Sequence, residues 1–193
     1  MPWSLLATPI GPLTLIAGPG GLRAIHFAGE GVTPPAADRD DAALAEARRQ
    51  LTEYFAGARR RFDLALDPGG TPFQRRVWDA VRTVPYGETT TYLQVARALG
   101  GPHLSRAVGA ANARTPIPIV LPCHRVLGSD GRLTGYRGGL AVKRALLERE
   151  RGRRYAASTA GSARSSSGAG ASPSDRSASN SRTPSPSRVR TVG

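Results

Sequence analysis

Residues 91–113, TYLQVARALGGPHLSRAVGAANA, decide the fold of this chain. Thr91 and Gln94 form a capping-box pattern, which predicts a helix that runs through Leu99. The Gly-Gly-Pro run at 100–102 turns the chain, and Ser105 is expected to cap a second helix at about 106–113. Two short helices around a glycine turn are the outline of a helix-turn-helix, a motif that enters DNA grooves. A tight helix–helix contact in an ordinary core is the alternative on spacing alone.

The flanking segments predict an α+β chain. On the C-terminal side of a break at 67–70, Thr71 and Gln74 repeat the capping box, and an amphipathic helix is expected over 140–150. On the N-terminal side, the patterns predict strands over 13–17, 22–27 and 62–66 and a helix over 38–55. We therefore expect three parts: a small strand-helix domain (1–67), a mostly helical DNA-binding domain (68–152) and a disordered tail rich in Ser, Arg, Gly and Pro (153–193).

Charge is distributed unevenly along the chain. Residues 1–67 carry a net charge of −1, residues 68–152 carry +8 and residues 153–193 carry +6, which together give +13. A basic domain attracts polyanions, so nucleic acid is the first partner to consider. An arginine-rich composition with no ligand behind it is the alternative on charge alone.

Cys123 is the single cysteine of the chain. A single cysteine excludes an intramolecular disulfide framework and a cysteine-rich zinc site, so we expect no bound metal. A lone thiol is typical of a reducing compartment, so we expect a cytoplasmic protein. The first residues lack the positive n-region of a secretory signal, and no apolar run reaches membrane-spanning length, which predicts no membrane association.

The thiol of Cys123 has a histidine, His124, as its neighbour and follows a stiff apolar run at 117–122. Because the thiolate is the reactive form of cysteine, an adjacent base favours a role as nucleophile. A bare Cys-His pair is also consistent with a buried structural cysteine, so the surrounding sequence has to decide.

Several short motifs follow one another along the second half of the chain, and their order and spacing are informative. They are Gly70-Thr71-Pro72-Phe73-Gln74, Val84-Pro85-Tyr86-Gly87-Glu88, Arg106-Ala107-Val108-Gly109-Ala110-Ala111-Asn112, Pro122-Cys123-His124-Arg125-Val126, Gly135-Tyr136, Lys143 and Glu150. In this arrangement the chain resembles the O6-alkylguanine-DNA alkyltransferases (methylated-DNA–protein-cysteine methyltransferases), closely over 70–152 and in outline over the first 67 residues.

This resemblance implies direct-reversal DNA repair in one irreversible step. Cys123 would accept the alkyl group of O6-alkylguanine, His124 would activate the thiol through a bridging water, and Glu150 would orient the histidine. Tyr92 would donate a proton or hydrogen bond to the departing guanine. A solvated surface glutamate and a core aromatic are the ordinary alternatives for the last two residues.

The resemblance also implies how double-stranded DNA is bound. Arg106 would fill the space of a guanine flipped into the protein, and close approach would use the small residues Ala107, Gly109, Ala110 and Ala111. Phosphate contacts are expected from Arg114, Arg125, Arg132 and Arg137, although Arg125 is the first of these to suspect of a structural ion pair. The base pocket would be lined by the loop residues Tyr136, Arg137 and Gly138.

The chain departs from the family pattern at Thr115, where an asparagine is usual. Threonine makes fewer hydrogen bonds, which bears on the rate of transfer or the position of Cys123. One alternative function is a noncatalytic lesion-binding or regulatory DNA-binding protein, although such relatives carry tryptophan in place of the cysteine. Another is a Cys-His hydrolase or transferase for small substrates. We expect a monomer that needs no cofactor.

Overall fold

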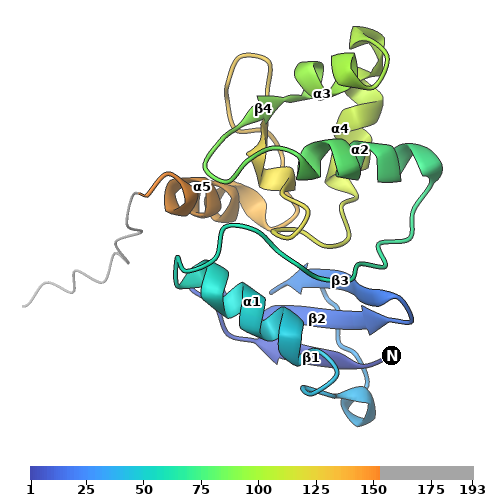
Figure 1. The fold of residues 1–193 in the computed structure, drawn as a ribbon, viewed down its shortest axis with the longest axis vertical. Coiled ribbons are helices and arrows are strands. Elements are labelled where there is room, and N and C mark those ends of the chain that lie inside the picture. Colours follow the sequence, from blue (N-terminus) through green and yellow to red (C-terminus); the bar gives the residue numbers. More distant parts are fainter. Residues whose placement is uncertain (153–193) are drawn as a thin grey trace, which may run out of the picture. The chain divides into compact units, whose positions relative to one another are not determined.

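The computed structural model describes residues 1–152, so the tail that we expect to be disordered lies outside the described residues. Strands β1 (Trp3–Leu6), β2 (Leu13–Gly18) and β3 (Gly21–Phe27) form an antiparallel sheet in the order β1-β2-β3. Helix α1 (Ala45–Phe55) lies across one face of this sheet (Figure 1). The α+β fold class is therefore confirmed.

The N-terminal part departs from the sequence predictions at three places. Strand β1 is an addition, since its short sequence at the chain start carries a weak signal. The predicted strand over 62–66 does not form, because only the bridge between Leu22 and Leu66 pairs it with β3. The helix begins at Ala45 instead of residue 38, because the Asp40 carboxylate accepts hydrogen bonds from the amides of residues 42 and 43 and so stabilises a turn.

The C-terminal part holds α2 (Pro72–Arg82), α3 (Tyr92–Ala98), α4 (Ser105–Ala113) and α5 (Gly139–Glu150). Both predicted capping boxes, at Thr71 and Thr91, are confirmed with their reciprocal hydrogen bonds. Ser105 is not the cap of α4, because its hydroxyl donates to the Pro102 carbonyl inside the preceding 3-10 turn (Pro102–Leu104). Short strands β4 (Thr90–Thr91) and β5 (Val126–Leu127) pair in parallel.

The helix-turn-helix of α3 and α4 is fixed to α2 by a buried hydrogen bond. The indole nitrogen of Trp78 donates to the Ala111 carbonyl at 3.0 Å. This bond removes a donor that would be costly to bury alone, and it sets the position of α4 relative to α2.

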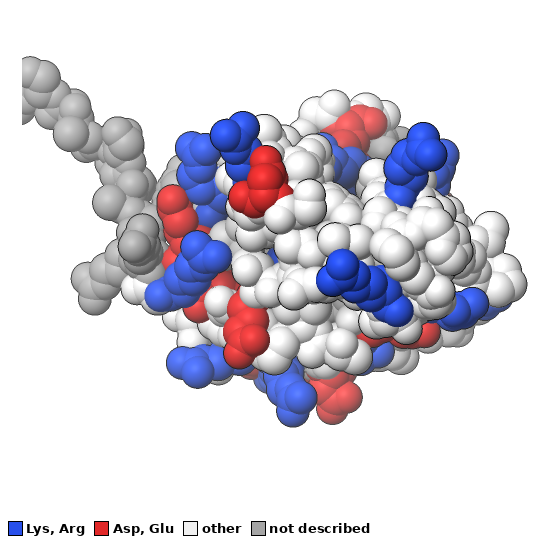
Figure 2. Space-filling model, turned by 90° about the horizontal axis from the view of Figure 1, so that it is seen from above, with Lys and Arg blue, Asp and Glu red and all other residues white. Residues whose placement is uncertain are grey.

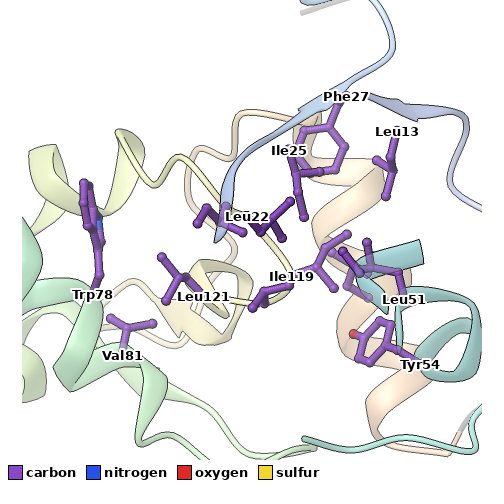
Figure 3. Close-up of a cluster of buried hydrophobic side chains, with 14 of the residues drawn as sticks. Leu13, Leu22, Ile25, Phe27, Leu51, Tyr54, Trp78, Val81, Ile119 and Leu121 are labelled. Carbon is purple, nitrogen blue, oxygen red and sulfur yellow. The ribbon is translucent and has the colours of Figure 1, made fainter. Parts of the chain in front are cut away.

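A hydrophobic core runs from the sheet to the helices of the C-terminal part. Ile25 of β3 and Leu51 of α1 lie on one side, Val81 of α2 lies on the other, and Ile119 and Leu121 lie between them (Figure 3). The segment that leads to Cys123 is therefore enclosed by both parts of the chain. The expected boundary near residue 67 stays a prediction.

Candidate active site

Cys123 lies in a 3-10 turn (Cys123–Arg125) directly after the buried segment 117–121. That segment closes on itself, since the Leu121 amide donates to the Ile117 carbonyl at 2.9 Å. Ile119 in this turn has a φ of 75°, which is strained for a β-branched residue and costs roughly 1–3 kcal/mol. Complete burial of its side chain holds the strained conformation in place and fixes where the cysteine stands.

A cavity of about 420 Å³ has Cys123 in its wall. Four residues that the sequence predicts for the site, Tyr92, Gly109, Tyr136 and Arg137, line the same cavity. Gly138, predicted for the base pocket, is not among the lining residues. A side chain at that position would meet the ring of Phe27 at 3.0 Å, so the absence of a side chain lets the loop pack against β3.

The carboxylate of Glu150 joins the site from α5. It accepts hydrogen bonds from His124 Nε2 at 2.8 Å, from the Tyr54 hydroxyl at 2.8 Å and from the Arg125 guanidinium at 2.9 Å. The Gly87 amide donates to it at 3.1 Å. Gly87 has a φ of 82°, and a side chain there would stand 3.0 Å from the Glu150 carbonyl oxygen, so glycine is required for this close approach.

These contacts determine the charge states of Glu150 and His124. Burial alone would raise the pKa of Glu150, but the hydrogen bonds and charges of His124 and Arg125 outweigh burial and hold that pKa well below its usual range. Burial lowers the pKa of His124, although Glu150 opposes the shift. His124 is therefore neutral at pH 7. Because its Nε2 hydrogen faces a carboxylate, the lone pair is on Nδ1, which has no hydrogen-bond partner within residues 1–152.

Cys123 is only 5 % exposed, and burial raises the pKa of its thiol. A hydrogen bond from Thr115 opposes this shift most, followed by the charges of Arg137 and Lys143. The Lys143 ammonium is buried and donates to the Val126 carbonyl at 2.7 Å. Glu30 pairs with Arg137 at 3.0 Å, so the N-terminal part holds one residue of the cavity wall in place. A thiol in this setting depends on a base for its activation.

The hydroxyl of Tyr92 accepts a hydrogen bond from the Thr134 hydroxyl at 3.1 Å. Both hydroxyls can donate and accept, so Tyr92 can act as the acceptor in this bond and give its phenolic proton to another group. Tyr92 is the first residue of α3, where the capping box at Thr91 fixes the start of the helix. The phenol therefore stands in the cavity wall with a donor available.

Helix α4 presents arginine and small residues to solvent. Arg106, Ala107, Ala110 and Arg114 are exposed, in agreement with a close-approach surface. Ala111 is buried in the core, so its predicted place on that surface is wrong. Figure 2 views the molecule from the side of α3 and α4 and shows separate basic groups, with acidic groups among them, around a broad uncharged area.

The remaining predicted arginines differ in their surroundings. The side chain of Arg132 is 86 % exposed and lies 3.5 Å from Asp130, so it is accessible to a phosphate. Arg125 has a side chain that is only 7 % exposed and pairs with Glu150, which excludes a phosphate contact and confirms the structural ion pair. Arg137 is held by Glu30 and by the Ile25 carbonyl.

Three further buried polar groups support the site, and of these the sequence singles out only Thr115. The Tyr54 hydroxyl reaches Glu150 from a helix face that reads as purely apolar. Asn112 sits among the small residues of α4 and donates to the Cys123 carbonyl at 3.4 Å. Thr115 donates its hydroxyl to the Asn112 carbonyl at 2.7 Å. For Asn112 the sequence offered one hint, which is a polar residue among the apolar and small residues of this helix.

A second cavity, of about 740 Å³, is larger but does not include Cys123. Its wall contains the exposed residues Arg60, Arg61 and Arg82, and it lies behind Ile119. The smaller cavity is the candidate site, because it alone of the two brings a nucleophile to its surface.

Among residues 1–152 no three His, Cys, Asp or Glu side chains come together in a way that could hold a metal ion. Within that same range, none of the helices is both long and apolar enough to cross a membrane.

A helix-turn-helix beside a cavity with an activatable thiol defines a DNA-binding protein that carries its own nucleophile. Two family models match the chain: the 6-O-methylguanine DNA methyltransferase ribonuclease-like domain over 1–68 and the DNA-binding domain of the same family over 72–152. The chain therefore belongs to the 6-O-methylguanine DNA methyltransferase family, whose activity is DNA repair by alkyl transfer to a protein cysteine.

Individual relatives agree with this assignment. The chain is 45 % identical over 154 residues to a methylated-DNA–protein-cysteine methyltransferase of Methanosarcina acetivorans, covering 78 % of this chain and 98 % of that protein. It is 49 % identical over 149 residues to the protein of the same name from Mycobacterium tuberculosis, covering 76 % and 90 %. The crystal structure of Mycobacterium tuberculosis OGT in complex with DNA superposes with a TM-score of 0.73 at 47 % identity, covering 79 % of this chain and 94 % of that chain.

Proposed function

We propose that Cys123 accepts the alkyl group of an O6-alkylguanine in double-stranded DNA in one irreversible displacement. The observation that carries this proposal is the position of Cys123 in a cavity beside Tyr92, with the His124–Glu150 pair next to it in the chain's interior. This is the nucleophile, base and orienting residue that an activated thiol requires.

The reaction balances within these groups. The thiol proton passes to His124 Nδ1 through a bridging water, and the thiolate attacks the alkyl carbon. A sulfur–carbon bond forms as the carbon–O6 bond breaks, and the guanine leaves with the electron pair. Glu150 stabilises the imidazolium that results, because its carboxylate is fixed on the other ring nitrogen.

Tyr92 is the group that we propose to assist departure. Its phenolic proton is available when Thr134 supplies the proton of the bond between the two hydroxyls. Donation of that proton, or a hydrogen bond, to a ring nitrogen of the leaving guanine neutralises the negative charge that develops there. The transfer needs no cofactor, because the alkyl carbon moves directly to sulfur.

DNA reaches the thiol by base flipping. A stacked guanine cannot bring its O6 substituent to the thiol of a cysteine that is 5 % exposed, so the nucleotide has to leave the helix and enter the cavity. The exposed surface of α4 suits close approach to the minor groove, with Arg106 in the vacated space. Arg114 and Arg132 are exposed and suit phosphate contacts.

The product is a thioether, which no group in the cavity can cleave. Each molecule therefore reacts once, as a single-turnover methyltransferase. We propose that it works as a monomer, and sedimentation at increasing protein concentration tests this. A lone cysteine that must stay reduced suits the cytoplasm.

Mass spectrometry of the protein after incubation with duplex DNA that contains one O6-methylguanine tests the proposal. One methyl group on the Cys123 peptide, at most one per molecule, is expected, with none in a Cys123→Ala control. A folded protein that binds the duplex but gains no methyl group would leave lesion binding as its function.

A further inference from the structure

Asn112 is one of the polar residues of the cavity wall that the proposed mechanism does not use. It lies on α4, lines the cavity of Cys123 and is 5 % exposed. Its amide nitrogen donates to the Cys123 carbonyl at 3.4 Å. Its amide oxygen, Oδ1, is buried and has no hydrogen-bond partner in the described part of the chain.

The orientation of this amide follows from its neighbour. The Cys123 carbonyl only accepts hydrogen bonds, so the amide NH₂ has to face it and Oδ1 has to face elsewhere. The nearby hydroxyl of Thr115 does not satisfy Oδ1, because its single proton is shared between the backbone carbonyl of Asn112 and the Cys123 sulfur. A buried acceptor without a partner is costly, which points to a donor that arrives with a ligand.

We infer that Asn112 reads the flipped base by accepting a hydrogen bond on Oδ1 from the 2-amino group of O6-alkylguanine. Alkylation at O6 removes the proton from N1, so N1, N3 and N7 are all acceptors. The exocyclic 2-amino group is then the hydrogen-bond donor that the alkylated base has to offer. An acceptor fixed beside the nucleophile matches that donor. This inference rests on the proposed function, since it concerns the same cavity and the same base.

The inference predicts which lesions the cavity favours. O4-alkylthymine carries no N–H on its ring, because alkylation at O4 leaves N3 without a proton. Bound in the cavity, it would leave Oδ1 of Asn112 unpaired. Sites built around a hydrogen bond discriminate strongly against analogues that lack the matching group. Alkylguanine is therefore preferred over O4-alkylthymine, and Asn112 is a specificity-determining residue.

Single-turnover transfer to two matched duplexes tests this assignment. One duplex carries O6-methylguanine, and the other carries O6-methylhypoxanthine, which is the same base without the 2-amino group. With the natural sequence, we expect methyl transfer to Cys123 to be about tenfold slower from the hypoxanthine duplex, the effect of one lost hydrogen bond. With Asn112→Leu, which removes the acceptor and retains the volume, the two rates should become equal within about twofold.

Two further variants keep the result interpretable. Val108→Ala changes a buried apolar residue one turn earlier on α4. This variant should slow methyl transfer from both duplexes equally and should retain the tenfold preference. Asn112→Ala replaces the leucine variant if the latter does not fold. Equal rates from the two duplexes with the natural sequence overturn the inference, as does a tenfold preference that persists without Asn112. Absence of methyl transfer from both duplexes overturns the proposed function and this inference together.

Discussion

Glu150→Gln is expected to destabilise the fold strongly and to slow transfer, because the Glu150 carboxylate faces donors only. Its two oxygens accept five hydrogen bonds, from Tyr54, Gly87, His124 and twice from Arg125. A glutamine offers one oxygen, and its NH₂ group would face donors in place of the second. The imidazole of His124 would also lose the charge that stabilises its protonated form.

The magnitude follows from the burial of the ion pair. The side chains of Glu150 and Arg125 are 0 % and 7 % exposed, so water does not screen the charge that the substitution leaves behind. Removing one partner of such a pair costs about 3–5 kcal/mol. Each kcal/mol lowers Tm by about 2–4 °C in a protein of this size, so Tm should fall by about 6–20 °C.

The pH dependence gives a second, independent readout. The pKa of Glu150 is depressed in the folded protein, so its stabilisation is present above the unfolded pKa of 4.5 and is lost as pH falls below that value. The difference in Tm between the natural protein and Glu150→Gln should therefore be largest near pH 7 and should shrink below about pH 4.5. Thermal denaturation followed by circular dichroism measures both effects.

Glu148→Gln on the same helix is the matched control, because that side chain is partly exposed and makes no ion pair within residues 1–152. Its Tm should stay within about 2 °C of the natural protein, as expected for a surface substitution. An unchanged Tm of Glu150→Gln at pH 7 would refute the proposal that the ionised carboxylate of Glu150 stabilises the fold. A difference in Tm that stays constant down to pH 3 would refute it as well.

Three further predictions concern the thiol and its surroundings. At pH 7, iodoacetamide should modify Cys123 in DNA-free protein about tenfold or more slowly than free cysteine, since burial raises the pKa of the thiol; equal rates by mass spectrometry would contradict this. Thr115→Asn should speed single-turnover transfer about tenfold, because the single Thr115 proton is shared between the Asn112 carbonyl and the Cys123 sulfur, whereas an amide has two protons. A slower or unchanged rate would show that threonine is no handicap. Glu30→Gln should slow transfer severalfold by releasing Arg137 from the cavity wall, with Tm lowered by only a few degrees; an unchanged rate would remove the N-terminal part from the site.

Local signals predicted the C-terminal half of the fold well. The capping boxes at Thr71 and Thr91 place the starts of α2 and α3, because the reciprocal bonds involve only residues three apart. The same locality explains the errors in the N-terminal half. Whether the segment 62–66 becomes a strand depends on partners elsewhere in the chain, and β3 offers it a single bridge.

The site was predictable in its chemistry and only partly in its geometry. The motif around Cys123 and the family resemblance gave the residues that gather at the cavity and at Glu150. The connection between Glu150 and Tyr54 joins α5 to α1 across 96 positions of sequence, and no local pattern encodes it. The link between Glu30 and Arg137 is of the same kind, since it depends on how the sheet packs against the loop before α5.

The burial of Cys123 makes sense for a protein that its own reaction consumes. A thiol with a low pKa and an open surface would react with any electrophile, and each such event would remove one molecule for good. Here burial raises the pKa of the thiol and lowers the pKa of His124, so both groups are neutral before DNA arrives. The charge that activates them is already in place on Glu150, where four neighbours hold it. Reactivity therefore depends on what enters the cavity, and the unpaired oxygen of Asn112 gives that cavity a way to distinguish O6-alkylguanine from O4-alkylthymine.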